Sequence, residues 1–144
     1  MRRTAFALAS GVMPRGSLQQ IALLESFLLH VRNLLEFVVP QKNVCGETVI
    51  ASDFFPSPDP WQGDFENGER RAQELFESEI HQHQNWTDFD LHRFRGKLHT
   101  TLAHISYSNK EQIQWPFVLV LSGVEKALNH FMSRAAEHGV DGVF

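Results

Sequence analysis

Two histidines in the second half of the chain are its best candidates for proton transfer. His99 and His104 lie in the segment KLHTTLAHISY (Lys97–Tyr107), and the ordinary pKa of histidine lies closest to neutral pH. On a helix, five residues separate them by about 140°, so they do not face one metal ion together. His104 shares its side of such a helix with Arg93 and Lys97. The alternative is that either histidine only caps or packs.

A second polar group consists of Glu25, Arg32 and Glu36, whose spacings of seven and four residues place them on one helix face. Apolar side chains flank this face on both sides, so we expect a central, largely buried helix whose charges must be paired. They either form an internal ion-pair network, or Arg32, with Asn33 beside it, binds a phosphate or carboxylate. The apolar flanks are Leu23, Phe27, Leu34 and Val38 on one side and Ile21, Leu24, Leu28 and Leu35 on the other.

The charges of the chain are unevenly distributed. Residues 47–90 hold eleven of the seventeen acidic residues, whereas residues 91–110 hold none. The second stretch carries Arg93, Arg95, Lys97 and Lys110. A basic stretch of this kind can contact a phosphate backbone, which makes Arg93 and Arg95 candidate substrate-binding residues. The alternative is a solvated helix face, or pairing with the acidic half of the chain.

The segment EIHQHQ is the only hint of a metal site. Glu77 and His81 are four residues apart, but no second ligand set with matching spacing accompanies them. The sequence also has no phosphate-binding glycine loop, no nucleophile elbow and no Cys/His zinc cluster. We therefore expect neither a metal nor a cofactor.

The segments that contain these residues are predicted to be helices. The apolar positions repeat with a helical period, which predicts an all-α, single-domain bundle of four or five helices over residues 1–144. The segment Thr48–Phe55 is too short to classify. The expected helices are a weak one through Thr4–Ser10, one from Leu18 to about Val39 capped by Ser17, an exposed one over 66–84, one capped by Thr87 and running to about Ser106, and one that starts at Trp115-Pro116 and ends at Gly139.

Composition sets the broad class of the protein. The 144 residues correspond to one domain, and 42% apolar residues are enough for its core. No apolar run approaches the roughly 20 residues of a membrane span, so we expect no membrane partner. The single Cys45 cannot form an internal disulfide. A reducing compartment and a cytoplasmic location are therefore expected.

Four segments together resemble an uncharacterised group of small bacterial helical proteins. They are LLESFLLHVRNLLEF (Leu23–Phe37), VIASDFF (Val49–Phe55), HTTLAHISY (His99–Tyr107) and the pair Trp115-Pro116. The likeness covers roughly residues 21–117, and the pattern is similar to that of the HEPN-like superfamily of helical bundles. Many HEPN domains are metal-independent RNases of toxin–antitoxin and phage-defence systems. Others only bind nucleotides or partner proteins.

The resemblance implies specific roles. His104 matches the histidine of the HEPN motif, in which an arginine precedes the histidine by a short spacer. No arginine stands at that distance in this chain, and Lys97 lies seven residues before His104. His104 would move protons at the ribose 2′-hydroxyl or the leaving 5′-oxygen. Arg32, or Lys97 from a facing subunit, would stabilise the phosphorane, and His99 is a further candidate. The resemblance also implies RNA as substrate, a homodimer, and an antitoxin or other partner protein. The competing interpretation is a non-catalytic helical module that binds a nucleotide or a partner.

Overall fold

A computed structural model shows an all-helical chain. It describes residues 1–12, 14, 17–40, 49–55, 68–104 and 115–140. The described part contains no β-strand, and the predicted all-α bundle is confirmed. The helices are α1 (Arg2–Ala9), α2 (Leu18–Val38), the short 3-10 helix η1 (Ala51–Phe54), α3 (Glu69–Ile80), α4 (Leu91–His104) and α5 (Phe117–Glu137). None of them combines the length and apolar content of a membrane span.

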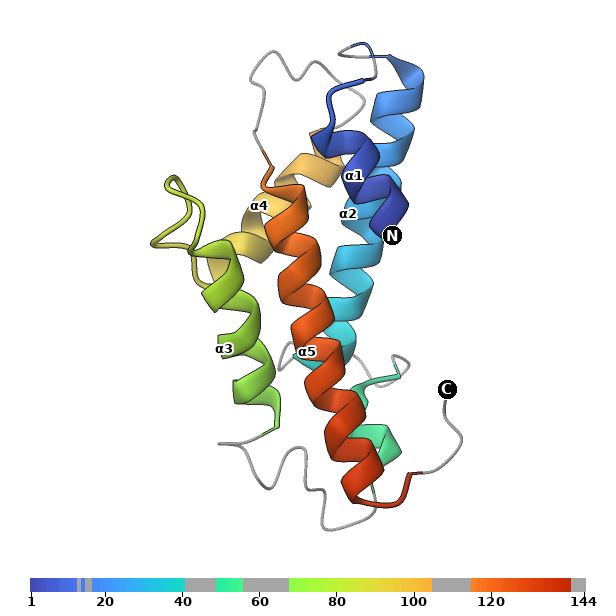
Figure 1. Ribbon diagram of the computed structural model, residues 1–144, viewed down its shortest axis with the longest axis vertical. Coiled ribbons are helices and arrows are strands. Elements are labelled where there is room, and N and C mark those ends of the chain that lie inside the picture. Colours follow the sequence, from blue (N-terminus) through green and yellow to red (C-terminus); the bar gives the residue numbers. More distant parts are fainter. Residues whose placement is uncertain (13, 15–16, 41–48, 56–67, 105–114, 141–144) are drawn as a thin grey trace.

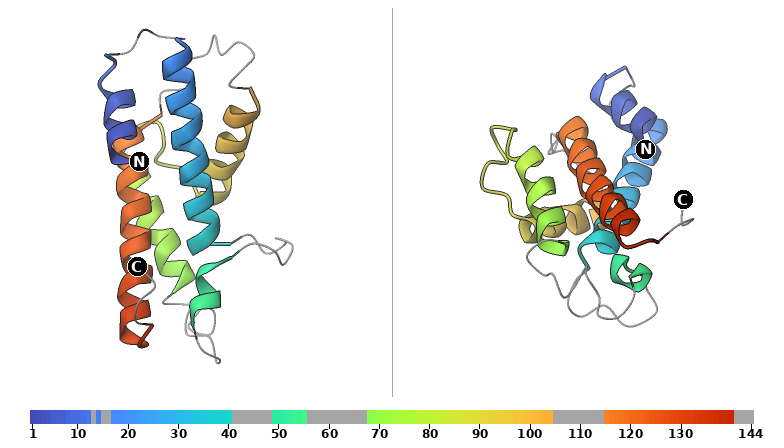
Figure 2. Two further views of the ribbon diagram at one scale, coloured as in Figure 1. Left: turned by 90° about the vertical axis from the view of Figure 1, so that its right-hand side faces the viewer. Right: turned by 60° about the horizontal axis from the view of Figure 1, so that its bottom comes forward.

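Helix α5 lies at the centre of the bundle. It packs along α3 on one side and against α1 and α2 on the other (Figure 1). Helix α4 contacts α2 and α3, and it lies across the bundle rather than along α5 (Figure 2). Helix α4, whose charged residues are all basic, therefore joins the side of the bundle formed by α2 to the side formed by α3.

Several predicted helix ends are confirmed. The side chain of Ser17 accepts a hydrogen bond from the backbone N–H of Gln20 at 3.2 Å, so it caps α2. Helix α5 starts directly after Trp115-Pro116, and Gly139 follows its end with a φ of 70°. The predicted helix over 66–84 is shorter in the structure. The expected end of α4 near Ser106 lies outside the described residues, as does Cys45.

The core is rich in phenylalanine. Phe76 and Phe94 meet edge to face with ring centroids 4.8 Å apart, and Phe37 meets Phe131 at 5.0 Å. Gly123 on α5 lies against Phe76 so closely that an added Cβ would be 2.9 Å from the ring and 3.0 Å from the backbone oxygen. This close approach explains why α3 and α5 form the most extensive helix pair in the described structure.

The expectation that α2 would be the most buried helix is wrong. Helix α5 buries seven residues and α2 five, although both contain 21 residues. The polar face of α2 is turned outward: Glu25, Ser26 and Asn33 are exposed, and Arg32 and Glu36 are partly exposed. The physical reason is the position of α2 at the side of the bundle, where each of its two apolar flanks has two buried and two only partly buried side chains.

Candidate functional site

The candidate site is the outward face of α4, and two acidic side chains fix where that helix begins. The carboxylate of Asp90 accepts a hydrogen bond from the backbone N–H of Arg93 at 2.7 Å. The carboxylate of Glu77 on α3 accepts one from the N–H of Leu91, also at 2.7 Å. Both satisfy N–H groups that have no partner within the first turn, and their charge suits the helix dipole. Thr87 is therefore not the cap that the sequence predicted, because the helix starts at Leu91.

The outward face of α4 carries basic and polar groups around a glycine. Its exposed residues are His92, Arg93, Gly96, His99, Thr100 and Ala103. No acidic residue occurs anywhere in α4. Among the described residues, nothing beyond the chain neighbours and backbone of its own helix lies within 4 Å of the position that a Cβ on Gly96 would occupy. This face is therefore open, and no side chain of its own helix brings a negative charge to it.

Arg93 and His99, two of the predicted site residues, lie on this open face. The guanidinium of the exposed Arg93 donates to the backbone oxygen of Asp88 at 3.1 Å. The exposed His99 follows His92 by two helical turns on the same side.

Lys97 lies at the edge of the face, above two aromatic rings. Its ammonium is 5.0 Å from the ring centroid of Trp86 and 5.4 Å from that of Phe89, which is the geometry of a cation–π contact. Trp86 is only 3% exposed and packs against Phe94 and Trp115. The side chain of Lys97 is therefore held on the surface of an aromatic cluster that connects directly with the core.

Arg95 points to the other side of α4 and contacts the end of α2. Its guanidinium donates to the backbone oxygens of Leu35, at 3.3 Å, and of Val39. These carbonyls belong to the last turn of α2 and its C-cap residue, where a cation complements the dipole. Burial lowers the pKa of Arg95, while the carboxylates of Glu36 and Glu69 oppose this change. The contacts give Arg95 a capping role; its predicted role in substrate binding stays a prediction.

Arg32 forms the ion pair that the helical spacing predicted. Its Nε donates to the carboxylate of Glu36 at 3.0 Å, and the two side chains are 40% and 21% exposed. Glu25 and Asn33 on the same helix are exposed. The pair is thus a partly solvated surface pair and not a buried network, and Glu36 also contributes the negative charge next to Arg95.

The side chain of His104 lies outside the described structure, although its backbone forms the last residue of α4. Its predicted proximity to a cation therefore remains a prediction. The structure brings together Arg32, Glu36 and Arg95 at the contact of α2 with α4, and it places Arg93 and His99 on the outward face of α4.

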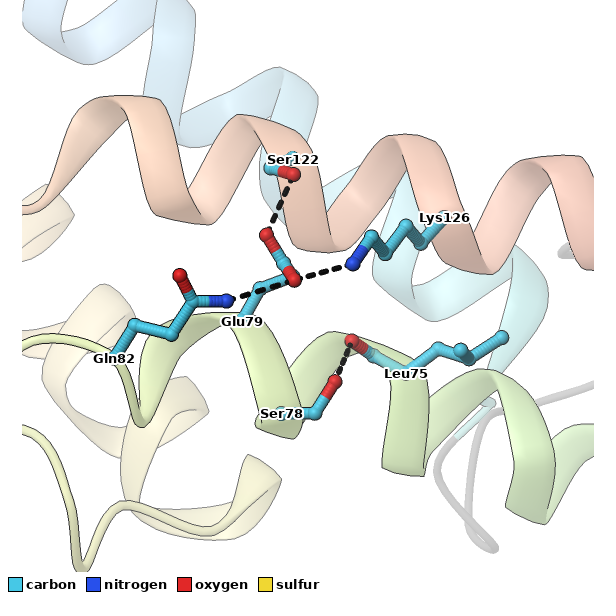
Figure 3. Close-up of polar contacts among 6 residues, drawn as sticks. All are labelled: Leu75, Ser78, Glu79, Gln82, Ser122 and Lys126. Atoms are coloured by element: carbon cyan, nitrogen blue, oxygen red, sulfur yellow. Dashed lines mark hydrogen bonds and ion pairs between the residues drawn. The ribbon is translucent and has the colours of Figure 1, made fainter.

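Sequence reasoning missed a buried carboxylate between α3 and α5. Glu79 is 7% exposed, and Figure 3 shows donors from α5 and from the turn that follows α3 around it. Its two oxygens accept hydrogen bonds from Ser122 at 2.7 Å, from Gln82 at 2.9 Å and from the ammonium of Lys126. The contacts with Lys126 and then Ser122 lower the pKa of the Glu79 carboxyl although burial opposes them. Its position seven residues after the buried Ala72 was the signal that could have revealed it.

The histidine-rich segment after α3 serves local structure. The ring Nε2 of His81 lies 2.8 Å from the backbone oxygen of Phe89. Glu77, its expected companion in a metal site, instead accepts hydrogen bonds from Gln73, at 2.8 Å, and from Leu91. Among the described residues, no group of three or more His, Cys, Asp or Glu side chains is arranged to hold a metal ion.

Comparison of the chain with protein-family models, with curated proteins and with solved structures finds no match.

Proposed function

We propose that this protein binds single-stranded RNA along the outward face of α4, as a HEPN-like domain of a toxin–antitoxin or phage-defence system. One observation supports the proposal most directly. The exposed residues of α4 include Arg93, His92, His99 and Thr100, and the helix carries no acid. Arginine and polar side chains of this kind bind phosphate oxygens. No residue of α4 itself repels a phosphate, and the nearest carboxylate before the helix, that of Asp90, accepts a hydrogen bond from the backbone N–H of Arg93.

The glycine at the centre of this face favours a close approach of the ligand. Gly96 has no side chain, and no described part of the chain outside its own helix comes within 4 Å of the place where a Cβ would lie. A glycine in an exposed helix interior lowers stability by roughly 0.5–1 kcal/mol relative to alanine. A glycine with this destabilising effect is expected where the backbone of a ligand must lie directly against the helix.

Cleavage is the second part of the proposal. His104 would accept the proton of a ribose 2′-hydroxyl as its oxygen attacks the adjacent phosphorus. The 5′-oxygen then leaves with a proton, and the product ends in a cyclic phosphate. The negative charge on the phosphorane needs a cation. Arg32 and Lys97 were expected to supply it, and in this structure Arg32 pairs with Glu36 while Lys97 lies on Trp86 and Phe89. Lys97 of the facing subunit of a homodimer, once it has left its two rings, is the proposed source of that cation.

Binding and cleavage are tested in one experiment. Labelled single-stranded RNA is incubated with wild type, Arg93→Gln, His104→Ala and, as control, Arg70→Gln, in the presence of EDTA. Arg70 is an exposed arginine of α3, paired with Glu74 at 3.3 Å, and it lies on another helix. We expect Arg93→Gln to weaken binding and to reduce the dependence of log K on log salt by about 0.7, and Arg70→Gln to leave both unchanged. Cleavage in EDTA should be lost in His104→Ala with folding retained.

A non-catalytic interaction or nucleotide-binding module is the second candidate function. The observation that favours it is the internal engagement of three predicted site cations: Arg32 with Glu36, Arg95 with the end of α2, and Lys97 with two rings. If the well-folded wild type forms dimers and binds RNA or a nucleotide but leaves RNA intact, this module is the correct function. If no polyanion binds, the proposed role of α4 is wrong.

A further inference from the structure

The aromatic pair beneath Lys97 is the feature of the basic helix that phosphate binding does not explain. The rings of Trp86 and Phe89 lie with centroids 4.6 Å apart and planes 32° from parallel. On the inner side, Trp86 packs against Phe94 and Trp115, at 5.9 and 5.3 Å between centroids. These contacts fix the ring of Trp86 before any ligand arrives.

Among the described residues, a flexible lysine side chain lies over the pair, and the ring centroid of His83 lies 6.5 Å from that of Trp86. The ammonium of Lys97 lies over both rings, at 5.0 and 5.4 Å, and Lys97 is itself only partly buried. A flexible stem of four carbons joins its ammonium to the helix, so the ammonium can leave the rings without any change in the backbone. Arg93 precedes Lys97 by one helical turn and is exposed. Arg93, the proposed phosphate-binding residue, therefore lies next to an aromatic surface that the side chain of Lys97 can cover or leave.

We infer that the outer surface of Trp86 and Phe89 is a stacking subsite for one unpaired nucleobase of RNA, and that Lys97 covers this subsite in the free protein. The inference rests on the proposed function, because it concerns the same ligand on the same helix. When a base stacks on the rings, the ammonium of Lys97 moves away and lies beside the phosphate that follows that base.

The relative strengths of the two contacts favour the exchange. A cation–π contact of a partly exposed lysine corresponds to a preference of about two- to fivefold. Stacking of one base on an aromatic side chain contributes about fivefold to more than a hundredfold in affinity. The base therefore displaces the ammonium of Lys97 from the rings. The ammonium then contacts a phosphate of the RNA in place of the rings.

The test compares two ligands that share their phosphates. One is a short labelled 2′-O-methyl oligouridine, which has no 2′-hydroxyl to attack and stays intact. The other is an abasic 2′-O-methyl oligomer of the same length. Fluorescence anisotropy at fixed salt gives both affinities for wild type, Phe89→Leu and Arg93→Gln. Phe54→Leu is the matched control, because Phe54 is also partly buried and packs on Phe37 and Phe131 far from α4 in the sequence.

Wild type should bind oligouridine at least fivefold more tightly than the abasic oligomer. Phe89→Leu should remove most of this difference and leave abasic binding unchanged, whereas Arg93→Gln should weaken both ligands alike. Phe54→Leu should behave like wild type. Equal affinity of wild type for the two ligands overturns the stacking subsite, whatever the variants do. Failure of both ligands to bind instead overturns the proposed function.

Discussion

The same substitution, glycine to alanine, should have opposite effects at two helical positions of this protein. Gly96 and Gly123 each lie inside a helix, α4 and α5 respectively. In both cases alanine reduces the entropy of the unfolded chain, which favours the folded state by about 0.5–1 kcal/mol. At Gly96 no atom of the described structure outside the local helix backbone lies within 4 Å of the new Cβ, so this gain is retained. We expect Gly96→Ala to raise the melting temperature by roughly 2–3 °C for a chain of this size.

At Gly123 the new Cβ meets Phe76. It would lie 2.9 Å from a ring carbon, 3.0 Å from the backbone oxygen and 3.3 Å from Cα of that residue. The ring is fully buried against Phe94, and the backbone atoms cannot move without α3. Overpacking of this kind costs about 1–3 kcal/mol, and with backbone atoms involved we use the upper part of that range. After the gain in helix propensity, Gly123→Ala should lose about 1–2 kcal/mol and melt roughly 3–6 °C lower.

Both variants are measured by thermal unfolding followed by circular dichroism, together with urea unfolding at 25 °C. The double variant should show the sum of the two effects, because the positions share no contacts. Equal stabilisation by both single substitutions would refute the reasoning, because it would mean that α3 and α5 do not approach as closely at Gly123 as the structure shows.

Three further changes test the polar contacts. The pKa of Glu79 is lowered in the folded state. Its contribution to stability is therefore present above the unfolded-state pKa of about 4.3 and is lost as the pH falls through the folded-state pKa. The free energies of unfolding in urea of wild type and Glu79→Gln should differ at neutral pH and converge in acid. Arg95→Ala uncaps the end of α2 and should cost about 1–3 kcal/mol by urea unfolding, whereas the exposed Arg93→Ala should change stability by less than about 0.5 kcal/mol. Arg32→Ala should cost only about 0.3–0.5 kcal/mol, as expected for a partly exposed pair on one helix, and a loss near 3–5 kcal/mol would show that the pair with Glu36 is buried.

The helices and their ends could mostly be predicted from the sequence, because the signals for them are local. Ser17 caps α2, and Trp115-Pro116 comes just before α5, since a cap or a proline acts on the turn beside it. The Arg32–Glu36 pair follows from a spacing of four residues on one helix. The acid-free character of α4 can be read directly from its composition.

The tertiary structure alone decided which of the charged residues are engaged. Arg95 and Lys97 are two residues apart and look equivalent in the sequence, yet one caps α2 and the other lies on Trp86 and Phe89. Their partners come from other elements, and helical spacing does not contain the angle at which elements cross. For the same reason α5 rather than α2 is the most buried helix, and Glu79 is enclosed by donors from a helix more than forty residues away in the sequence. Periodicity shows that a face is apolar or polar, but only the packing of the helices shows what covers it.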